Sequence, residues 1–217
     1  MNIINKMPLE NIQVVVICLN YSDFLKITYE KNIRFFNRNN YHIITAKEDQ
    51  KTIDLCTHLN IRYEIYQDFY LNSSKLNKSG AIHKIQKRLH NDFPNDWILL
   101  LDADIILPDN FEELFLSKCN NNSCLYSLKR KDYEEEEDYK ESKNLIDYTG
   151  INFMGFMQLY HNKTKFYPEF SNDCGICDAI FRDYFFDYLV LIDEHSYVVH
   201  LGKKDINNRG RVTGFWN

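Results

Sequence analysis

The sequence predicts an α/β fold with a mostly parallel central sheet flanked by helices. Residues 12–101 alternate between strand-like and helix-like patterns, which is typical of strands joined by right-handed crossover helices. Residues 12–19 and 97–101 are continuous apolar runs, as expected for strands buried on both faces. With only 7 Gly and 4 Pro among 217 residues, the chain has little room for long linkers.

The first half gives a regular series of elements. Its helices place apolar side chains at helical spacing, as Ile82, Ile85 and Leu89 show. In chain order we expect a strand at 12–19, a helix at 23–37, a strand at 41–45, a helix at 49–59, a strand at 61–66, a helix at 80–90 and a strand at 97–101.

The second half is less regular. We expect strands at 123–128, 153–161, 190–192 and 197–201, and a helix at 175–188. Residues 129–143 include the acidic run 134–138, and adjacent like charges favour a solvated loop there.

Size and charge limit the function classes. A length of 217 residues suits a single domain, and a net charge of −5 argues against a protein that coats nucleic acid. No apolar run approaches the ~20 residues of a membrane span, and the N-terminus resembles no signal peptide. We therefore expect a cytoplasmic protein without a transmembrane segment.

The cysteines allow two interpretations. Cys119 with Cys124, and Cys174 with Cys177, have a spacing that a structural zinc ion accepts. In a reducing compartment the alternative is a set of free thiols near the ends of the sheet.

The most informative segment is the acidic pair that follows the apolar strand at 97–101. Asp102 and Asp104 are separated by one residue, and alternation in an extended chain would point both carboxylates to the same side. Ligands of parallel sheets bind beyond the carboxyl ends of the strands. Paired carboxylates there suit Mg²⁺ or Mn²⁺ bridging to the phosphates of a nucleotide. A turn cap beside a solvated carboxylate is the alternative.

From residue 14 to residue 211 the chain resembles GT-A glycosyltransferases, close to the family-2-like enzymes of large viruses, phages and polysaccharide loci. Several segments in order carry the resemblance, among them the DxD motif at 101–104. The others are 20–23, 45–49, 77–82, 155–160, 199–202 and 208–211.

The resemblance implies one GT-A domain with a nucleotide-binding half at 12–107 and an acceptor-side half with a smaller β region at 108–217. It also implies transfer from a nucleotide sugar, with UDP as the expected nucleotide, to a hydroxyl of a glycan, by a hexosyl- or deoxyhexosyltransferase. For a viral chain the compartment would be the host cytoplasm.

Metal and donor contacts follow from the same resemblance. Asp104 would bind Mn²⁺ or Mg²⁺ directly, with Asp102 nearer the ribose and able to share the ion. His200 would be a third ligand as a neutral imidazole, or else a core histidine at a strand end. The expected contacts to the donor come from Asn20, Tyr21, Asp49, Lys78, Asp102, Arg209 and Arg211. Lys78 precedes an expected helix, whose N-terminus favours phosphate; an ordinary surface lysine is the alternative.

Inversion at the sugar carbon requires a carboxylate base. Asp178 lies three residues before Phe181, in an Asp-x-x-Phe pattern associated with this subgroup, and is the first candidate. Asp173 is the second, and its alternative role is to cap a helix.

Two other functions remain open. A sugar-nucleotidyltransferase would need a glycine-rich loop directly after the first strand, where this chain has Asn20-Tyr21-Ser22-Asp23. The other is a non-catalytic relative that binds a carbohydrate or a nucleotide, against which the retained Asp102, Asp104 and His200 argue.

Overall fold

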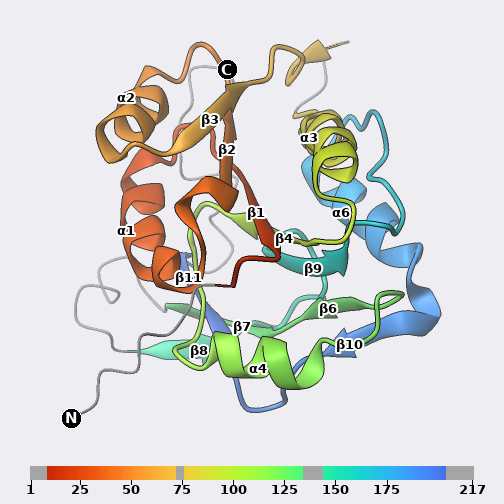
Figure 1. Ribbon diagram of the computed structural model, residues 1–217. Coiled ribbons are helices and arrows are strands. Elements are labelled where there is room, and N and C mark those ends of the chain that lie inside the picture. The colour runs from red at the N-terminus through yellow and green to blue at the C-terminus, as the bar shows by residue number, and fades with distance from the viewer. Residues whose placement is uncertain (1–8, 72–75, 134–143, 204–217) are drawn as a thin grey trace.

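The computed structural model describes residues 9–71, 76–133 and 144–203. Two sheets and their helices make up the architecture (Figure 1). The strands are β1 (Ile12–Ile17), β2 (Tyr41–Thr45), β3 (Arg62–Ile65), β4 (Trp97–Asp102), β5 (Ile105–Ile106), β6 (Leu125–Ser127), β7 (Lys129–Tyr133), β8 (Leu145–Asp147), β9 (Met157–His161), β10 (Leu189–Leu191) and β11 (Tyr197–Lys203). The α-helices are α1 (Ser22–Asn32), α2 (Gln50–Leu59), α3 (Lys78–Asp92), α4 (Phe111–Lys118) and α6 (Cys174–Asp183).

The larger sheet has seven strands in the order β10-β6-β9-β4-β1-β2-β3. Neighbouring strands β4, β1, β2 and β3 are parallel, and β9 is antiparallel to both β4 and β6. The predicted α/β class with a mostly parallel central sheet is confirmed. The smaller sheet has the order β5-β11-β7-β8.

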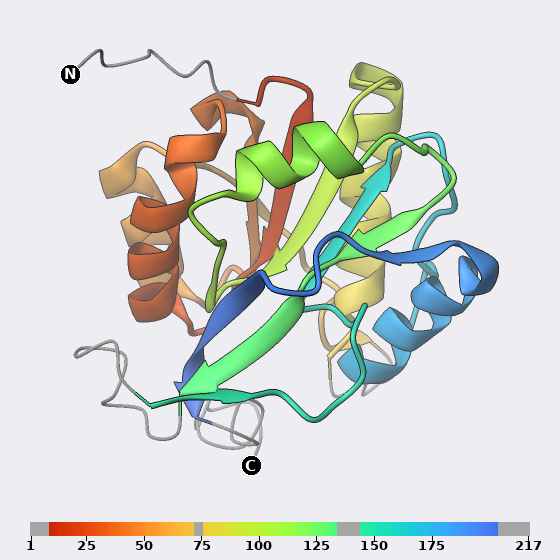
Figure 2. The ribbon, with the colours of Figure 1, turned by 90° about the horizontal axis from the view of Figure 1, so that it is seen from below.

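Helices cover both faces of the larger sheet (Figures 1 and 2). On one face, Val14, Val16 and Leu99 pack in the core with α1, α2 and α4. On the other face, Val15 and Leu100 pack with α3 and α6. The central strands β1 and β4 are therefore apolar except for Gln13 and Asp102 near their ends, which is why they could be recognised from sequence.

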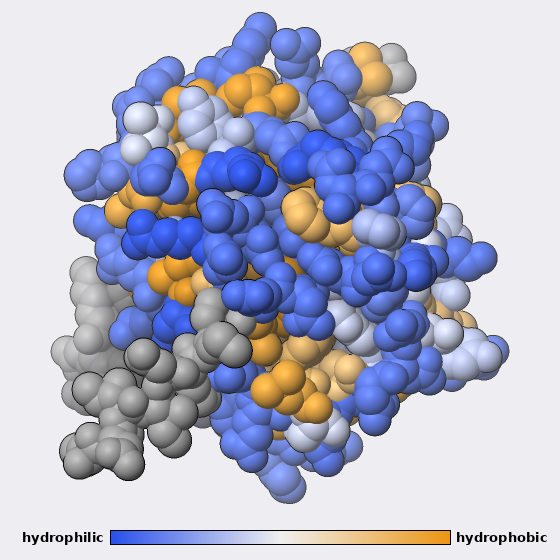
Figure 3. Space-filling view, in the orientation of Figure 1, coloured by the Kyte–Doolittle hydropathy of each residue, from blue (hydrophilic) through white to orange (hydrophobic). Residues whose placement is uncertain are grey.

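The surface seen in the orientation of Figure 1 is largely hydrophilic, with apolar groups in small separated patches (Figure 3). No helix in the described part of the chain is long and apolar enough to cross a bilayer.

Several predicted boundaries were wrong. The expected helix at 23–37 ends at Asn32 and continues as a 3₁₀ turn, Ile33–Phe35. The expected helix at 175–188 ends at Asp183, and a second 3₁₀ turn, Phe186–Tyr188, precedes β10. The expected strand at 153–161 begins only at Met157.

The segment between the expected strands at 123–128 and 153–161 was assigned no strand, which is wrong for its first part. The acidic run at 134–138, expected to form a solvated loop, lies outside the described residues. Residues Lys129–Tyr133 form β7, which pairs in parallel with β11. A strand rich in charged residues lacks the apolar pattern by which strands are recognised in a sequence. Here Lys131 and Asp132 pair with charged side chains of the neighbouring strands β8 and β11. Three further elements had no prediction: β5, α4 and β8.

A buried polar chain lies where β1, β2 and β4 begin. The Gln13 amide donates to Asp96 (2.8 Å), so its oxygen is free to accept from Nε2 of the fully buried His42 (2.9 Å). Nδ1 of that neutral ring faces the Arg88 guanidinium at 3.4 Å. Burial and the cations Arg88 and Arg62 lower the pKa of His42 from 6.5 to about 3.

This pKa predicts how stability depends on pH. His42 stays neutral in the folded chain but takes up a proton when unfolded below pH 6.5. The stability is therefore complete above pH 6.5 and falls as the pH approaches 3, by at most about 1.4 kcal/mol per pH unit from this group. The free energy of unfolding is measured in urea at several pH values between 3 and 6.5. Plotted against pH, it should change less steeply for His42→Gln than for the wild type. His58→Gln, at an exposed site, is the matched control; equal slopes for wild type and His42→Gln would contradict the assignment.

Candidate active site

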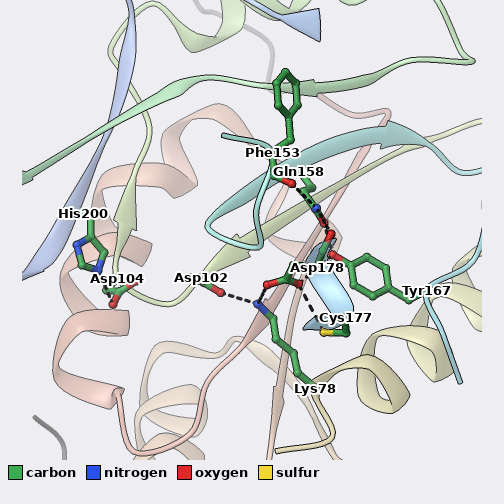
Figure 4. A network of polar contacts seen from close by, with 9 residues as sticks. All are labelled: Lys78, Asp102, Asp104, Phe153, Gln158, Tyr167, Cys177, Asp178 and His200. Carbon is green, nitrogen blue, oxygen red and sulfur yellow. Dashed lines mark hydrogen bonds and ion pairs between the residues drawn. The ribbon is translucent and has the colours of Figure 1, made fainter. Parts of the chain in front are cut away.

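The carboxyl end of β4 gathers the charged side chains of the site. β4 ends at Asp102, and the chain turns at residues 103 and 104 before β5. Alternation therefore stops at Asp102, and the expectation that both carboxylates point to the same side was wrong. Asp102 turns toward Lys78, and Asp104 turns toward His200 (Figure 4).

The first group is an ammonium between two carboxylates. Lys78 Nζ lies 2.9 Å from Asp102 Oδ1 and 3.3 Å from Asp178 Oδ2. Lys78 is the first residue of α3, whose N-cap Asn77 accepts from the Gly80 amide at 3.1 Å. The lysine is buried, so it is not an ordinary surface residue, and its ammonium is bound by carboxylates.

Asp178 is buried on the inner face of α6. The Tyr167 hydroxyl lies 3.2 Å from its Oδ1 and also reaches the Gln158 side-chain oxygen (Figure 4). Burial and the nearby Asp178 carboxylate hold the pKa of Tyr167 well above its usual value of 10, so the hydroxyl remains a proton donor. Gly155 packs against the same group, and a Cβ there would overlap both the Asp178 carboxylate and the Lys78 ammonium. The position therefore requires glycine.

The second group joins the two sheets. His200 Nε2 lies 3.1 Å from Asp104 Oδ2, and its Nδ1 lies 2.9 Å from Asp132 Oδ1. All three side chains are buried. Burial alone would lower the pKa of His200, but the two carboxylates outweigh it and raise that pKa from 6.5 to about 9. Against the opposing effect of burial, His200 lowers the pKa of Asp104, and His200 with Arg130 lowers that of Asp132.

Asp104 and His200 carry the two side-chain atoms that would hold a divalent cation once the proton between Nε2 and Oδ2 is lost. Two ligand atoms bound side by side on one ion at ~2.1 Å are about 3 Å apart, close to the 3.1 Å between Oδ2 and Nε2. Within the described ranges no cluster of three His, Cys, Asp or Glu side chains converges on such an ion. Mg²⁺-type ions commonly use one or two protein ligands and complete their coordination with water and substrate phosphates.

The predicted donor contacts near β1 have clear structural positions. Asn20 follows β1 with φ of 59°, and its N–H donates to Asp49 Oδ2 at 2.6 Å. Asp49 is buried and also accepts from Thr45 and from the amide and hydroxyl of Thr52. It caps α2 and holds the Asn20 loop in place. Tyr21 lies in the same loop, and its ring centroid is 6.0 Å from that of Phe24. Donor binding by these residues stays a prediction.

The remaining candidates divide into two sets. Asp173 directly precedes α6, and its carbonyl accepts from the Cys177 amide at 3.4 Å, consistent with the start of the helix. Lys78 forms an ion pair with Asp178, the first candidate base. A catalytic role for Asp173 stays a prediction. Arg209 and Arg211 lie outside the described residues.

The zinc interpretation of the cysteines was wrong. Cys124 packs in the core on one face of the larger sheet and Cys177 packs on the other. Cys124 and Cys177 lie on opposite sides of the sheet, so one ion cannot bind both pairs. Cys177 instead lies beside Asp178, with 3.7 Å between Sγ and Oδ1.

Sequence reasoning missed Asp132, Arg130, Tyr167 and Gln158. Arg130 and Asp132 fall in a charged stretch between two expected strands that was assigned no element of its own, and no motif marks them. The spacing of two residues would have suggested a shared strand face, but only if the stretch had first been recognised as a strand.

This architecture resembles that of several solved structures, although no sequence relative was found. No protein-family model and no curated protein sequence matches the chain. Among solved structures, a mannosyltransferase from Pyrobaculum calidifontis in complex with GDP-Man and Mn²⁺ has a TM-score of 0.52 at 11% identity. That match covers 90% of this chain but only 58% of the mannosyltransferase.

Two nucleotidyltransferase-type structures are similarly close. A Bacillus anthracis protein described as a glucose-1-phosphate thymidylyltransferase has a TM-score of 0.51 at 12% identity, covering 89% of this chain and 91% of that protein. A 4-diphosphocytidyl-2C-methyl-D-erythritol synthase has a TM-score of 0.50 at 12% identity, covering 91% of this chain and 95% of the synthase. The chain has the fold shared by GT-A glycosyltransferases and nucleotidyltransferases.

In a GT-A-like fold the carboxyl end of β4 is where the ligand site is expected, and this chain places a buried lysine there. Removing one member of a buried charge group costs about 3–5 kcal/mol, because it leaves the partners uncompensated. We expect Lys78→Met to lower the free energy of unfolding by this amount at pH 7 in urea. Adding Asp178→Asn to the Lys78→Met variant should restore part of the free energy of unfolding, because one of the two carboxylates left without a cation is then neutral.

The matched control is Lys129→Met, which breaks the exposed ion pair with Glu194 and should cost less than about 1 kcal/mol. A double-mutant cycle without coupling between Lys78 and Asp178 would contradict the ion pair.

Proposed function

We propose that this protein is a divalent-metal-dependent glycosyltransferase that moves a sugar from a UDP-sugar to a hydroxyl of a glycan. The observation that carries the proposal is the meeting of Asp104, in the turn after β4, and His200, on β11, beside the Lys78–Asp102–Asp178 group. Both groups lie at the carboxyl end of β4, and ligands of such folds bind beyond the carboxyl ends of the strands. The structural likeness to a mannosyltransferase holding GDP-Man and Mn²⁺ supports the same class of donor and ion.

In the proposed site Asp104 and His200 hold Mn²⁺ or Mg²⁺. The ion supplies positive charge to the departing diphosphate. His200 must give up the proton on Nε2 before that nitrogen can bind an ion, while Nδ1 stays against Asp132. Asp102 is proposed to contact the ribose or share the ion, and its side chain is 40% exposed, so it can reach a ligand.

Asp178 is the proposed general base. The acceptor oxygen attacks the sugar carbon, the bond from that carbon to the diphosphate breaks, and the hydroxyl proton passes to Asp178, with inversion at the carbon. Lys78 keeps this carboxylate and that of Asp102 compensated when no substrate is bound. Asn20, Tyr21, Arg209 and Arg211 are proposed to contact the nucleotide, and Asp49 to support the Asn20 loop.

A sugar-nucleotidyltransferase is the second candidate, because two such proteins share the fold. The connection between β1 and α1 argues against it. Only residues 18–21 separate the two elements, and none is glycine, so the segment offers no glycine-rich cradle for a triphosphate.

Turnover distinguishes the candidates. Incubation with a panel of UDP-sugars and Mn²⁺ should release UDP, whereas a nucleotidyltransferase would release pyrophosphate from UTP and a sugar 1-phosphate. If neither UDP nor pyrophosphate is released, and UDP binds without a metal ion, the result would identify a non-catalytic relative.

Asp104 provides the metal test. It is buried and faces His200, so Asp104→Ala would leave that buried histidine without one of its two carboxylates and disturb the fold. Asp104→Asn keeps the shape and should abolish Mn²⁺-dependent UDP binding in calorimetric titrations. Asp109→Asn, at an exposed carboxylate that pairs with Arg34, is the control. Unchanged affinity in folded Asp104→Asn would reject the metal-ligand assignment.

The base is tested by a pair of variants. Asp178→Asn should lower the transfer rate by about 10²–10⁴-fold while Mn²⁺-dependent UDP binding persists, because the donor site keeps its other groups. Asp173→Asn should transfer at close to the wild-type rate. The reverse pattern would make Asp173 the base.

A further inference from the structure

A row of four buried charged side chains crosses the smaller sheet. Arg130 Nε and Nη2 bind Asp132 Oδ1 and Oδ2 at 2.7 and 3.1 Å. Asp132 Oδ1 lies 2.9 Å from His200 Nδ1, and His200 Nε2 lies 3.1 Å from Asp104 Oδ2. The charges alternate along the row, and Asp132 and His200 have side chains only 1% and 2% exposed.

Strand register produces this row. β11 lies between β5 and β7, where His200 is opposite Ile105 on β5 and Asp132 on β7. Asp104 directly precedes β5 and accepts the Leu201 amide at its carbonyl (2.9 Å), which fixes it beside His200. The sheet therefore presents the two ring nitrogens of His200 to carboxylates on opposite sides.

The far end of the row is also fixed. Arg130 lies two residues before Asp132 on the same face of β7 and grips both carboxylate oxygens. Its guanidinium stacks on the Tyr148 ring, with 4.1 Å to the ring centroid, and lies 5.5 Å from that of Phe156. Arg130 therefore fixes the Asp132 carboxylate, whose Oδ1 also faces His200.

Stability alone is a weak reason for this arrangement. Buried charged groups cost desolvation energy, and well-packed apolar residues at such positions are often equally or more stabilising. The row leads to the Asp104–His200 pair and ends there, which suggests that it serves that pair.

We propose that Asp132 is a positioning residue that orients His200 for the metal ion, with Arg130 holding Asp132 in place. This inference rests on the proposed metal-dependent function. A histidine that binds a metal through one nitrogen commonly has the other hydrogen-bonded to a carboxylate, which fixes the ring and its protonated nitrogen. Here Asp132 Oδ1 lies at an ion-pair distance of 2.9 Å from Nδ1, without the alignment of a hydrogen bond, and Nε2 is on the side shared with Asp104.

The test measures Mn²⁺ affinity of the full chain by electron paramagnetic resonance of free Mn²⁺, without nucleotide or acceptor. Asp132→Ala should weaken binding about 10- to 100-fold. Asp132→Asn keeps the size of the side chain and the oxygen that faces Nδ1, and it should restore much of the affinity; it also serves if the alanine variant does not fold. Asp147→Ala, at an exposed carboxylate on the adjacent β8, is the control and should bind as the wild type does.

Thermal unfolding of the metal-free variants separates positioning from a purely structural role. A purely structural Asp132 would lower the melting temperature while the folded protein still bound Mn²⁺ normally. Normal affinity in folded Asp132→Ala, with Asp104→Asn and His200→Ala both defective, would overturn this inference and leave the proposed function standing. If the wild type itself does not bind Mn²⁺, or if Asp104→Asn binds normally, the proposed metal site fails and the inference fails with it.

Discussion

Compensation of carboxylates at the carboxyl end of β4 is the constraint on which the rest of the site depends. Two acidic side chains leave the sheet within three residues, Asp102 to Asp104, close to a third at Asp178. Like charges cannot be gathered in a partly dry space without cations. The fold supplies Lys78 from the start of α3 and His200 from β11.

Each cation also joins parts of the fold. Lys78 links the N-terminus of α3 to the inner face of α6, on the same side of the larger sheet. His200 links the smaller sheet to the turn that follows β4. The close packing of Gly155 against the Lys78–Asp178 pair shows how little space the first group leaves. The charged groups therefore help to define the architecture around the site.

The fold by itself does not choose between reactions. Similar architectures occur in a mannosyltransferase and in nucleotidyltransferases at 11–12% identity, so the argument for function has to come from the side chains. The short, glycine-free connection after β1 and the Asp104–His200 pair are the features that favour sugar transfer in this chain.

The sequence by itself determined the α/β class and the central strands, because strands buried on both faces leave a largely apolar run. The abrupt end of that run in charge also led to the prediction of a site at the acidic pair. It also identified Lys78, Asp178 and His200 as candidates, although not their partners. Only the tertiary structure separated Asp102 from Asp104 and brought Arg130 and Asp132 into the site, since a turn and a strand register decide both. A charged strand such as β7 resembles a solvated loop in sequence, because its charges are compensated by residues distant in the chain, as Asp132 is by His200.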